Sequence, residues 1–317
     1  MAPVNPGTES IPRLVVTSVV RGSQQGESHG GVYTIDFARQ EAIQHIDWNT
    51  SSIDFTGRGW DRGLRGIEIV GERVYIAASD ELFVYDREFR MLESFRCPYL
   101  RHCHEISRCE NLLFLTSTGY DSLLAFDLDQ RRFAWGLHLA RDGDGWTGRP
   151  FDPDGADGPA FGNALHINMV HATRAGIFTA GLRTRALLRI DGRLRISEVC
   201  SLPAGAHNAR PFRNGVLFND TEADCVRYVG RDGFERAFHV PVFDPATLEH
   251  VGIDDSRIAR QGFARGLCPL GDGLVAAGSS PSTVCVYDID SGRRIAAVTL
   301  SMDIRNAIHG LEIWPFD

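Results

Sequence analysis

A repeated strand pattern is the feature of this sequence that most limits its possible folds. Similar segments begin at Leu64, Cys103, Leu165, Ala206 and Ala264. Each has an apolar strand, a turn rich in small or polar residues, a second apolar strand, a second turn and a third strand, and a short fourth strand follows. Four short strands in about forty residues are typical of a β-propeller blade, because one such sheet must stack on neighbouring sheets to bury both of its faces.

The two ends of the chain supply a sixth blade. The C-terminal IHGLEIWPF, residues 308–316, matches LRGIEIVGE, the first strand of the copy at Leu64, but the chain stops there. The N-terminal stretches RLVVTSVV, GVYTIDF and EAIQHIDW supply the three missing strands. We therefore predict an extension over residues 1–12 and an all-β, six-bladed propeller over residues 13–317. The N-terminal strands are expected to close the ring by pairing with the C-terminal strand.

Two inserts interrupt the regular spacing of the repeats. They cover residues 141–161 and 240–261, are rich in Gly, Pro and Asp, and lead into the first strands of two blades. Long loops of this kind commonly act as lids or binding loops. We predict that both inserts cover the same mouth of the channel, where Trp146, Phe151 and Phe161 would exclude water.

Composition excludes several classes of partner. The 317 residues are 43% hydrophobic and 23% charged, as in ordinary globular proteins, and the formal net charge of -8 argues against nucleic acid. No apolar run has the length of a membrane span, and the N-terminus does not resemble a signal peptide, so we expect no membrane partner. The seven cysteines include no CxxC pair and fit reduced thiols. A cytoplasmic location follows as the expectation.

Histidines recur at one position of the repeat. In a propeller the first strand of each blade lines the central channel, so equivalent residues at its start form a ring. Only 11 of the 317 residues are histidine, so four at six equivalent positions are not expected by chance. A metal ion would satisfy the imidazoles and an anion would satisfy the guanidiniums, which are costly to bury without partners. The ring residues are His309, Arg65, His104, His166, His207 and Arg265.

The four-histidine ring restricts the metal. Ligation by imidazole alone suits Zn, Cu, Fe or Ni better than Mg or Ca. The site resembles that of the carotenoid-cleavage oxygenases, which are propellers that hold a non-haem Fe(II) on four histidines. The resemblance covers the architecture and the ring only, because those proteins have seven blades and are much longer. It implies Fe(II), with Cu, Mn or Zn as other possible ions. Metal-dependent propeller lyases, such as streptogramin and oligogalacturonate lyases, are a second resemblance, although they use fewer histidines and an oxygen ligand.

Three carboxylates lie close to the ring positions in sequence. Glu105 follows His104, while Glu68 and Glu312 come three residues after Arg65 and His309. Outer carboxylates commonly orient metal-binding histidines, so these three are candidates for that role. The alternative is that they form ion pairs with neighbouring blades.

Arginines at the ring indicate the charge of the substrate. Arg65 and Arg265 belong to the ring, and Arg62 and Arg101 are expected at the same rim. Because a bidentate guanidinium is well suited to a carboxylate or phosphate, we predict a small anionic substrate. The alternative is that these arginines pair with Glu68 or Asp61 and are structural.

These features predict a metal-dependent enzyme, most specifically a non-haem Fe(II) oxygenase that uses O₂ on a small carboxylate-bearing molecule. Tyr120 and Asp121, in a turn at the same rim, could move a proton. Trp146 would contact the substrate. A lyase or hydrolase that uses a ring histidine as base is one alternative. A non-catalytic binding propeller is another.

Overall fold

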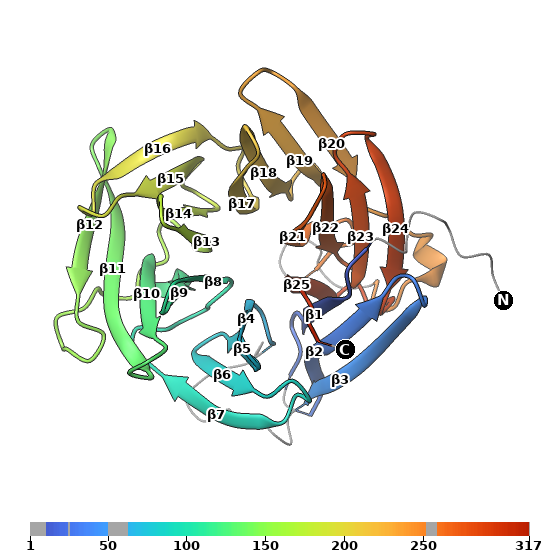
Figure 1. The fold of residues 1–317 in the computed structure, drawn as a ribbon, viewed down its shortest axis with the longest axis horizontal. Coiled ribbons are helices and arrows are strands. Elements are labelled where there is room, and N and C mark those ends of the chain that lie inside the picture. Colours follow the sequence, from blue (N-terminus) through green and yellow to red (C-terminus); the bar gives the residue numbers. More distant parts are fainter. Residues whose placement is uncertain (1–10, 25, 50–62, 252–258, 317) are drawn as a thin grey trace.

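The fold is a six-bladed β-propeller, as predicted. The computed structural model describes residues 11–24, 26–49, 63–251 and 259–316, and its six antiparallel sheets stand as blades around a central axis (Figure 1). Helical structure in this part of the chain is limited to two short 3-10 turns, η2 (Thr118–Tyr120) and η3 (Pro245–Thr247). No helix within it is long and apolar enough to cross a membrane.

Blade 1 joins the two ends of the chain. Its strand order places the C-terminal strand at the axis and the three N-terminal strands outside it. The register is antiparallel, with Val16 opposite Leu311. The predicted closure of the ring is therefore confirmed. The strands are β25 (Asn306–Ile313), β1 (Leu14–Val20), β2 (Ser28–Asp36) and β3 (Glu41–Asn49).

The other five blades follow one another along the sequence, each running from the axis outward. Blade 2 contains β4 (Ile67–Val70), β5 (Arg73–Ala78), β6 (Glu81–Tyr85) and β7 (Met91–Arg96). Blade 3 contains β8 (Ile106–Cys109), β9 (Leu112–Ser117), β10 (Ser122–Asp127), β11 (Arg132–Asp142) and β12 (Gly145–Phe151). Blade 4 contains β13 (Ile167–Thr173), β14 (Gly176–Gly181), β15 (Ala186–Ile190) and β16 (Ile196–Ser201). Blade 5 contains β17 (Ala206–Phe212), β18 (Gly215–Asp220), β19 (Cys225–Gly230) and β20 (Glu235–His239). Blade 6 contains β21 (Arg265–Gly271), β22 (Leu274–Ser279), β23 (Thr283–Asp288) and β24 (Arg293–Thr299).

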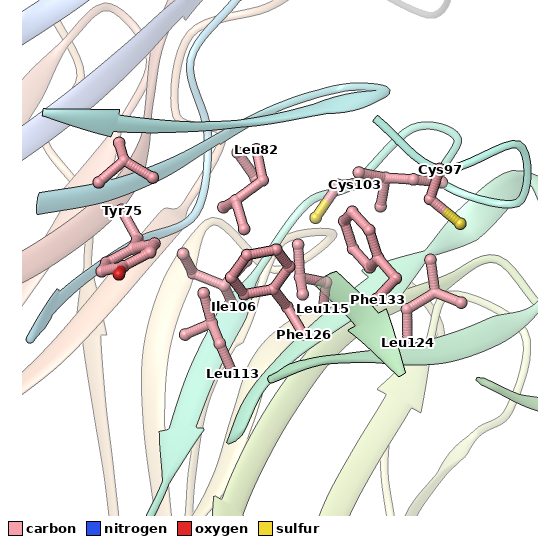
Figure 2. Close-up of a cluster of buried hydrophobic side chains, with 13 residues drawn as sticks. Tyr75, Leu82, Cys97, Cys103, Ile106, Leu113, Leu115, Leu124, Phe126 and Phe133 are labelled. Atoms are coloured by element: carbon pink, nitrogen blue, oxygen red, sulfur yellow. The ribbon is translucent and has the colours of Figure 1, made fainter. Parts of the chain in front are cut away.

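The hydrophobic core lies between the faces of neighbouring blades. A middle strand such as β10 is buried along its whole length, whereas the outer strand β7 is exposed at four of its six residues. Figure 2 shows the core between blades 2 and 3, where Leu82, Ile106 and Phe126 meet. Burying a large apolar side chain stabilises a fold by about 1.5–3 kcal/mol. The stack of sheets is thus held by side chains on both faces of each blade.

The innermost strands approach one another closely. A Cβ atom on Gly66 would lie 2.7 Å from the backbone nitrogen of Ile106 in the next blade. A Cβ atom on Gly310 would lie against the carbonyl oxygen of Arg65. Glycine is required at both positions because backbone from a neighbouring blade occupies the space of a side chain. This close approach narrows the channel and brings the side chains at the strand starts together.

The insert at 141–161 differs in part from the prediction. Residues Gly145–Phe151 form β12, which pairs with β11 at the outer edge of blade 3 and is not part of a lid. The reason is a tight turn at Gly143 and Asp144, where a positive φ of 57° at Gly143 lets the chain form a hairpin. Residues 152–161 then return inward. In the other insert, residues 252–258 lie outside the described part of the chain, and η3 is the helical turn within its described portion.

Candidate functional site

The ring predicted from the repeat is assembled at one mouth of the channel. Arg65 Nη1 donates a hydrogen bond of 3.1 Å to Nε2 of His104. The imidazole ring of His104 lies 5.4 Å from that of His166 and 6.1 Å from that of His309, measured between ring centroids. Three blades and the closing strand therefore place these four side chains in one cluster.

The remaining two ring members meet across an aromatic side chain. The rings of His207 and Phe263 lie 6.2 Å apart, and the Arg265 guanidinium lies 4.7 Å from the centroid of Phe263. Arg21 and Arg260 also approach this ring, at 4.4 and 5.3 Å. Phe263 was not identified from the sequence, because one phenylalanine before a strand gives no signal of its three cationic neighbours.

His104 and His207 are oriented in the same way. Nδ1 of His104 lies 2.7 Å from the carbonyl oxygen of His102 and 2.9 Å from Oγ1 of Thr118. Nδ1 of His207 lies 2.8 Å from the carbonyl oxygen of Gly205 and 2.9 Å from Oγ1 of Thr221. Because a carbonyl oxygen can only accept, Nδ1 carries the proton in both rings and Nε2 keeps its lone pair.

The threonines that support these histidines are equivalent in blades 3 and 5. Oγ1 of Thr118 donates to the carbonyl oxygen of Ile167 at 2.5 Å, and Oγ1 of Thr221 donates to that of Ala264 at 3.1 Å. Each hydroxyl thus fastens its histidine to the next blade. Sequence reasoning missed both, although their repeated place in the turn after the second strand was a usable signal.

His166 is positioned by polar groups that come just before it and from the turn at η2. Its Nδ1 lies 2.9 Å from Oδ1 of Asn163. The carboxylate of Asp121 accepts backbone N–H groups from Ala164, Leu165 and His166, the last at 2.8 Å. Asp121 was predicted to move a proton, but here both of its carboxylate oxygens accept hydrogen bonds from backbone N–H groups. Its observed role is to position the strand start that carries His166.

Burial makes the ring histidines neutral. It lowers the pKa of His104, His207 and His309 well below the usual value. Nearby Arg265 lowers all three pKa values further, and Arg65 lowers those of His104 and His309. The pKa of His166 falls to about 3 for the same reasons, with Arg265 the largest charged contribution. All four imidazoles are therefore neutral at neutral pH. Within the described residues, Nε2 of His207 and Nε2 of His309 have no hydrogen-bond partner.

The floor of the site is a buried network that crosses the channel. Glu105, from blade 3, accepts hydrogen bonds from Nη2 of Arg210 at 3.1 Å and Nδ2 of Asn208 at 3.3 Å, both in blade 5. It also accepts the backbone N–H of Val170, in blade 4, at 3.3 Å. A cavity of about 30 Å³, large enough for one water molecule, lies between this network and His309.

None of the three predicted carboxylates is hydrogen-bonded to a ring histidine in the described part of the chain. Glu105 belongs to the hydrogen-bonded network at the floor of the site. Glu68 accepts the backbone N–H of Arg108 at 2.9 Å. Glu312 accepts the backbone N–H of Ile313 at 2.9 Å. Hydroxyls, backbone carbonyls and an amide therefore orient the histidines in place of the expected carboxylates.

Glu68→Gln is expected to stabilise the protein at pH 8 and to change little at pH 5. Burial, followed by repulsion from Glu312, raises the pKa of Glu68 from 4.5 to about 7, while Arg108 opposes the shift. The folded chain thus holds this proton more tightly than the unfolded chain. The stability it contributes is complete below about pH 4.5 and is lost as the pH rises through about 7, on the order of 3 kcal/mol in all.

Urea unfolding of wild type and variant at pH 5 and pH 8 measures this difference. The matched control is Glu72→Gln, because the Glu72 side chain is 80% exposed. Equal pH dependence in wild type and Glu68→Gln would show that Glu68 is ionised throughout.

Other predicted site residues lie at different places. Trp146 lies on the outermost strand β12, where its Nε1 donates to Oε1 of Glu198 at 2.7 Å, so it does not line the ring. Phe151 packs edge-on against Tyr99 in the core beside blade 3. Arg62 lies outside the described residues.

The remaining predicted residues lie at the rim. The guanidinium of Arg101 lies 3.7 Å from the carboxylate of Asp80. Tyr120 contacts the rings of Tyr99 and Phe161 edge-on, with centroids 5.5 and 5.8 Å away. Both Arg101 and Tyr120 thus remain near the mouth that carries the ring.

The described side chains do not form a closed metal cage. No group of three or more His, Cys, Asp or Glu among them is arranged so that it could hold a metal ion. At His104 the position facing Nε2 is taken by the Arg65 guanidinium. Larger cavities, of about 650 and 540 Å³, lie between blades 4 and 5 and between blades 3 and 4, away from the ring.

Comparisons with known proteins agree on the fold. No family model matches the chain, and no curated protein matches its sequence. A solved protein of unknown function from Bacteroides caccae is 11% identical, with a TM-score of 0.57 over 95% of this chain and 98% of that one. A chain of a nidogen–laminin complex is 10% identical, with a TM-score of 0.55 over 94% and 97%. At these identities the similarity is one of propeller fold alone.

Proposed function

We propose that the axial ring is the active site of a metal-dependent enzyme that acts on a small carboxylate-bearing molecule. His104, His166, His207 and His309 would hold the metal, and Arg65 with Arg265 would bind the carboxylate. Fe(II) is the ion that fits four neutral imidazoles and the carotenoid-cleavage oxygenases that the ring resembles. The function proposed is therefore that of a non-haem iron oxygenase, with O₂ as second substrate and with Cu, Mn or Zn as other possible ions.

The observation that carries this proposal is the orientation of the histidines. His104, His166 and His207 each have Nδ1 within 2.7–2.9 Å of an oxygen acceptor. Metal-binding histidines commonly donate their other ring N–H to such an oxygen, which leaves Nε2 as the ligand. The imidazoles are held neutral by their surroundings, and their Nε2 lone pairs, which are buried at the axis, need an electrophilic partner.

Arg65 would couple the binding of a metal to the binding of an anion. Its guanidinium now donates to Nε2 of His104, and its positive charge opposes a cation at the ring. A substrate carboxylate would attract Arg65 away from His104 and offset that charge. We therefore expect the metal and a carboxylate to increase each other's affinity, as linkage requires.

Different residues of the protein would have different roles at this site. A bound Fe(II) would supply electron transfer to and from O₂. The imidazoles would hold the ion, Arg65 and Arg265 would orient the carboxylate, and the Glu105 network would form the floor below the ring. Elemental analysis of protein purified without chelators or a polyhistidine tag tests the proposal, and one bound transition metal ion per chain is the expected result.

Arg65→Met is expected to weaken binding of propionate, a minimal carboxylate probe, by roughly ten- to a hundredfold, because a hydrogen bond to a charged group contributes about 1.5–3 kcal/mol. Propionamide should bind poorly to the wild type and lose little more in the variant. Arg65→Lys should recover part of the loss, because an ammonium keeps the charge without the two-pronged geometry. Isothermal titration measures the five affinities. A lower melting temperature with unchanged propionate affinity would identify Arg65 as a structural residue.

A lyase or hydrolase is the second candidate, and a lone pair at the ring favours it. Nε2 of the buried His309, like that of His207, has no hydrogen-bond partner within the described residues. An imidazole without a bound ion could serve as general base, with three histidines left as ligands. This candidate would be supported if wild-type protein turns over substrate in the absence of O₂ and the His309→Ala protein keeps its metal but loses that turnover. A protein that binds no metal at all would leave a non-catalytic ligand-binding propeller.

The cysteines support a reducing compartment. All seven are free thiols, and five of them are buried. Buried reduced cysteines are usual in proteins that do not meet an oxidising environment. We therefore propose a cytoplasmic location, and we propose no nucleic-acid or membrane partner.

A further inference from the structure

Phe161 is an exposed aromatic side chain that is nevertheless held in place. It is 61% exposed, and its ring meets those of Tyr120 and His102 edge-on, with centroids 5.8 and 6.4 Å away. Its neighbour Gly162 donates a backbone hydrogen bond of 3.0 Å to Gly119. An exposed aromatic ring that its neighbours fix at a channel mouth can line a ligand site, as aromatic side chains commonly do.

The side chain of Phe161 lies directly over a glycine, Gly119. A Cβ atom on Gly119 would lie 2.7 Å from Cε2 of Phe161 and 3.0 Å from Cγ of Arg101. Phe161 and the hydrocarbon stem of Arg101 therefore lie directly on the η2 turn. The glycine lets both side chains settle there.

The same turn also holds the ring histidines. Thr118 hydrogen-bonds to His104, and Asp121 holds the backbone of His166. His102, which meets Phe161, supplies the carbonyl oxygen that orients His104. Phe161 is thus connected, through His102 and the η2 turn, to two of the four proposed metal ligands.

We propose that Phe161 and Tyr120 form an apolar platform that binds the hydrocarbon part of the substrate. The inference rests on the proposed function, because Arg65 and Arg265 take the carboxylate at the ring. The two features together select an amphipathic acid, in which an aromatic or extended apolar group is attached to a carboxylate. Small polar acids such as propionate use only the arginines. The platform is therefore a specificity determinant of the same site.

Two probes that differ by a phenyl group test the platform. Wild-type protein is expected to bind 3-phenylpropionate about tenfold more tightly than propionate, the advantage of burying one side of a phenyl group. Phe161→Ala should reduce this advantage to within about twofold and leave propionate affinity unchanged. Phe161→Leu should keep part of it. The control is Phe234→Ala, which removes another exposed phenylalanine, 37% exposed and packed on Tyr228 in blade 5, and should change neither affinity.

The outcomes separate this inference from the function on which it rests. A Phe161→Ala protein that keeps the tenfold preference overturns the platform and leaves the carboxylate site intact. A wild type that binds both probes equally does the same. If Arg65→Met leaves the affinity for propionate unchanged, the proposed carboxylate site is wrong and the platform falls with it.

Discussion

The double variant His166→Ala, His309→Ala is expected to lose at least roughly a hundredfold in affinity for Fe(II) or Zn(II), because losing even a residue that only orients a ligand commonly costs ten- to a hundredfold. Two of the four proposed ligands disappear, and His104 and His207 alone cannot complete a stable site. The chain should still fold, since these side chains point into the channel and the blade cores do not depend on them. Elemental analysis and circular dichroism of the purified variants measure both effects.

His239→Ala is the matched control for metal binding. His239 ends the outer strand β20 and is exposed, so its loss should leave the metal content unchanged. The single variants His166→Ala and His309→Ala should each bind metal more weakly than wild type. Full metal occupancy in the double variant would mean that the ring is not a metal site, and the anion-binding arginines would then remain as its main chemical feature.

The ring could be predicted from the sequence because it repeats. Each blade places its first strand at the axis, so aligning strand starts collected Arg65, His104, His166, His207, His309 and Arg265. The match between residues 308–316 and the strand after Leu64 showed how the ring closes. Both inferences depend only on the repeat period of the sequence, which can be read without knowing any side-chain contact.

Contacts across the channel could not be predicted in this way. Glu105 was expected to orient His104 because the two are adjacent in sequence, yet adjacent residues in a strand point in different directions. Its carboxylate reaches Arg210, 105 residues further along the chain. Pairings of this kind depend on how closely the blades approach one another at the axis, as they do at Gly66 and Gly310. No local sequence pattern predicts that distance.

The first insert shows a different failure. RDGDGWTGRPF has many residues typical of loops, but DGDG is also a hairpin signal between residues that can extend. The chain forms β12 because Gly143 accepts a positive φ and the edge of blade 3 offers free backbone groups for pairing. Composition predicted a loop, whereas the available sheet edge decided the outcome.

Arg210→Met is expected to destabilise the protein by about 3–5 kcal/mol at pH 8, because it leaves a buried carboxylate without its charged partner. The side chains of Arg210 and Glu105 are only 17% and 11% exposed. Burial already raises the pKa of Glu105, and Arg210 is the largest opposing influence. Without Arg210 the pKa rises further above its unfolded value. The loss should therefore be smaller at pH 5, where the carboxyl group can fold protonated, and larger at pH 8.

The double variant Glu105→Gln, Arg210→Met separates the cost of an unpaired charge from the worth of the pair. The single oxygen of the neutral amide can accept from Asn208 or from the Val170 backbone, which bind different oxygens of Glu105. The unpaired charge is gone, so much of the loss at pH 8 should be recovered. Arg213→Met is the surface control: its partner Asp290 is 63% exposed, and such pairs contribute less than about 1 kcal/mol. Urea unfolding at both pH values measures all three proteins. If Arg210→Met costs no more than Arg213→Met, or costs the same at pH 5 as at pH 8, Glu105 does not depend on Arg210, and Asn208 and the backbone hold the channel floor.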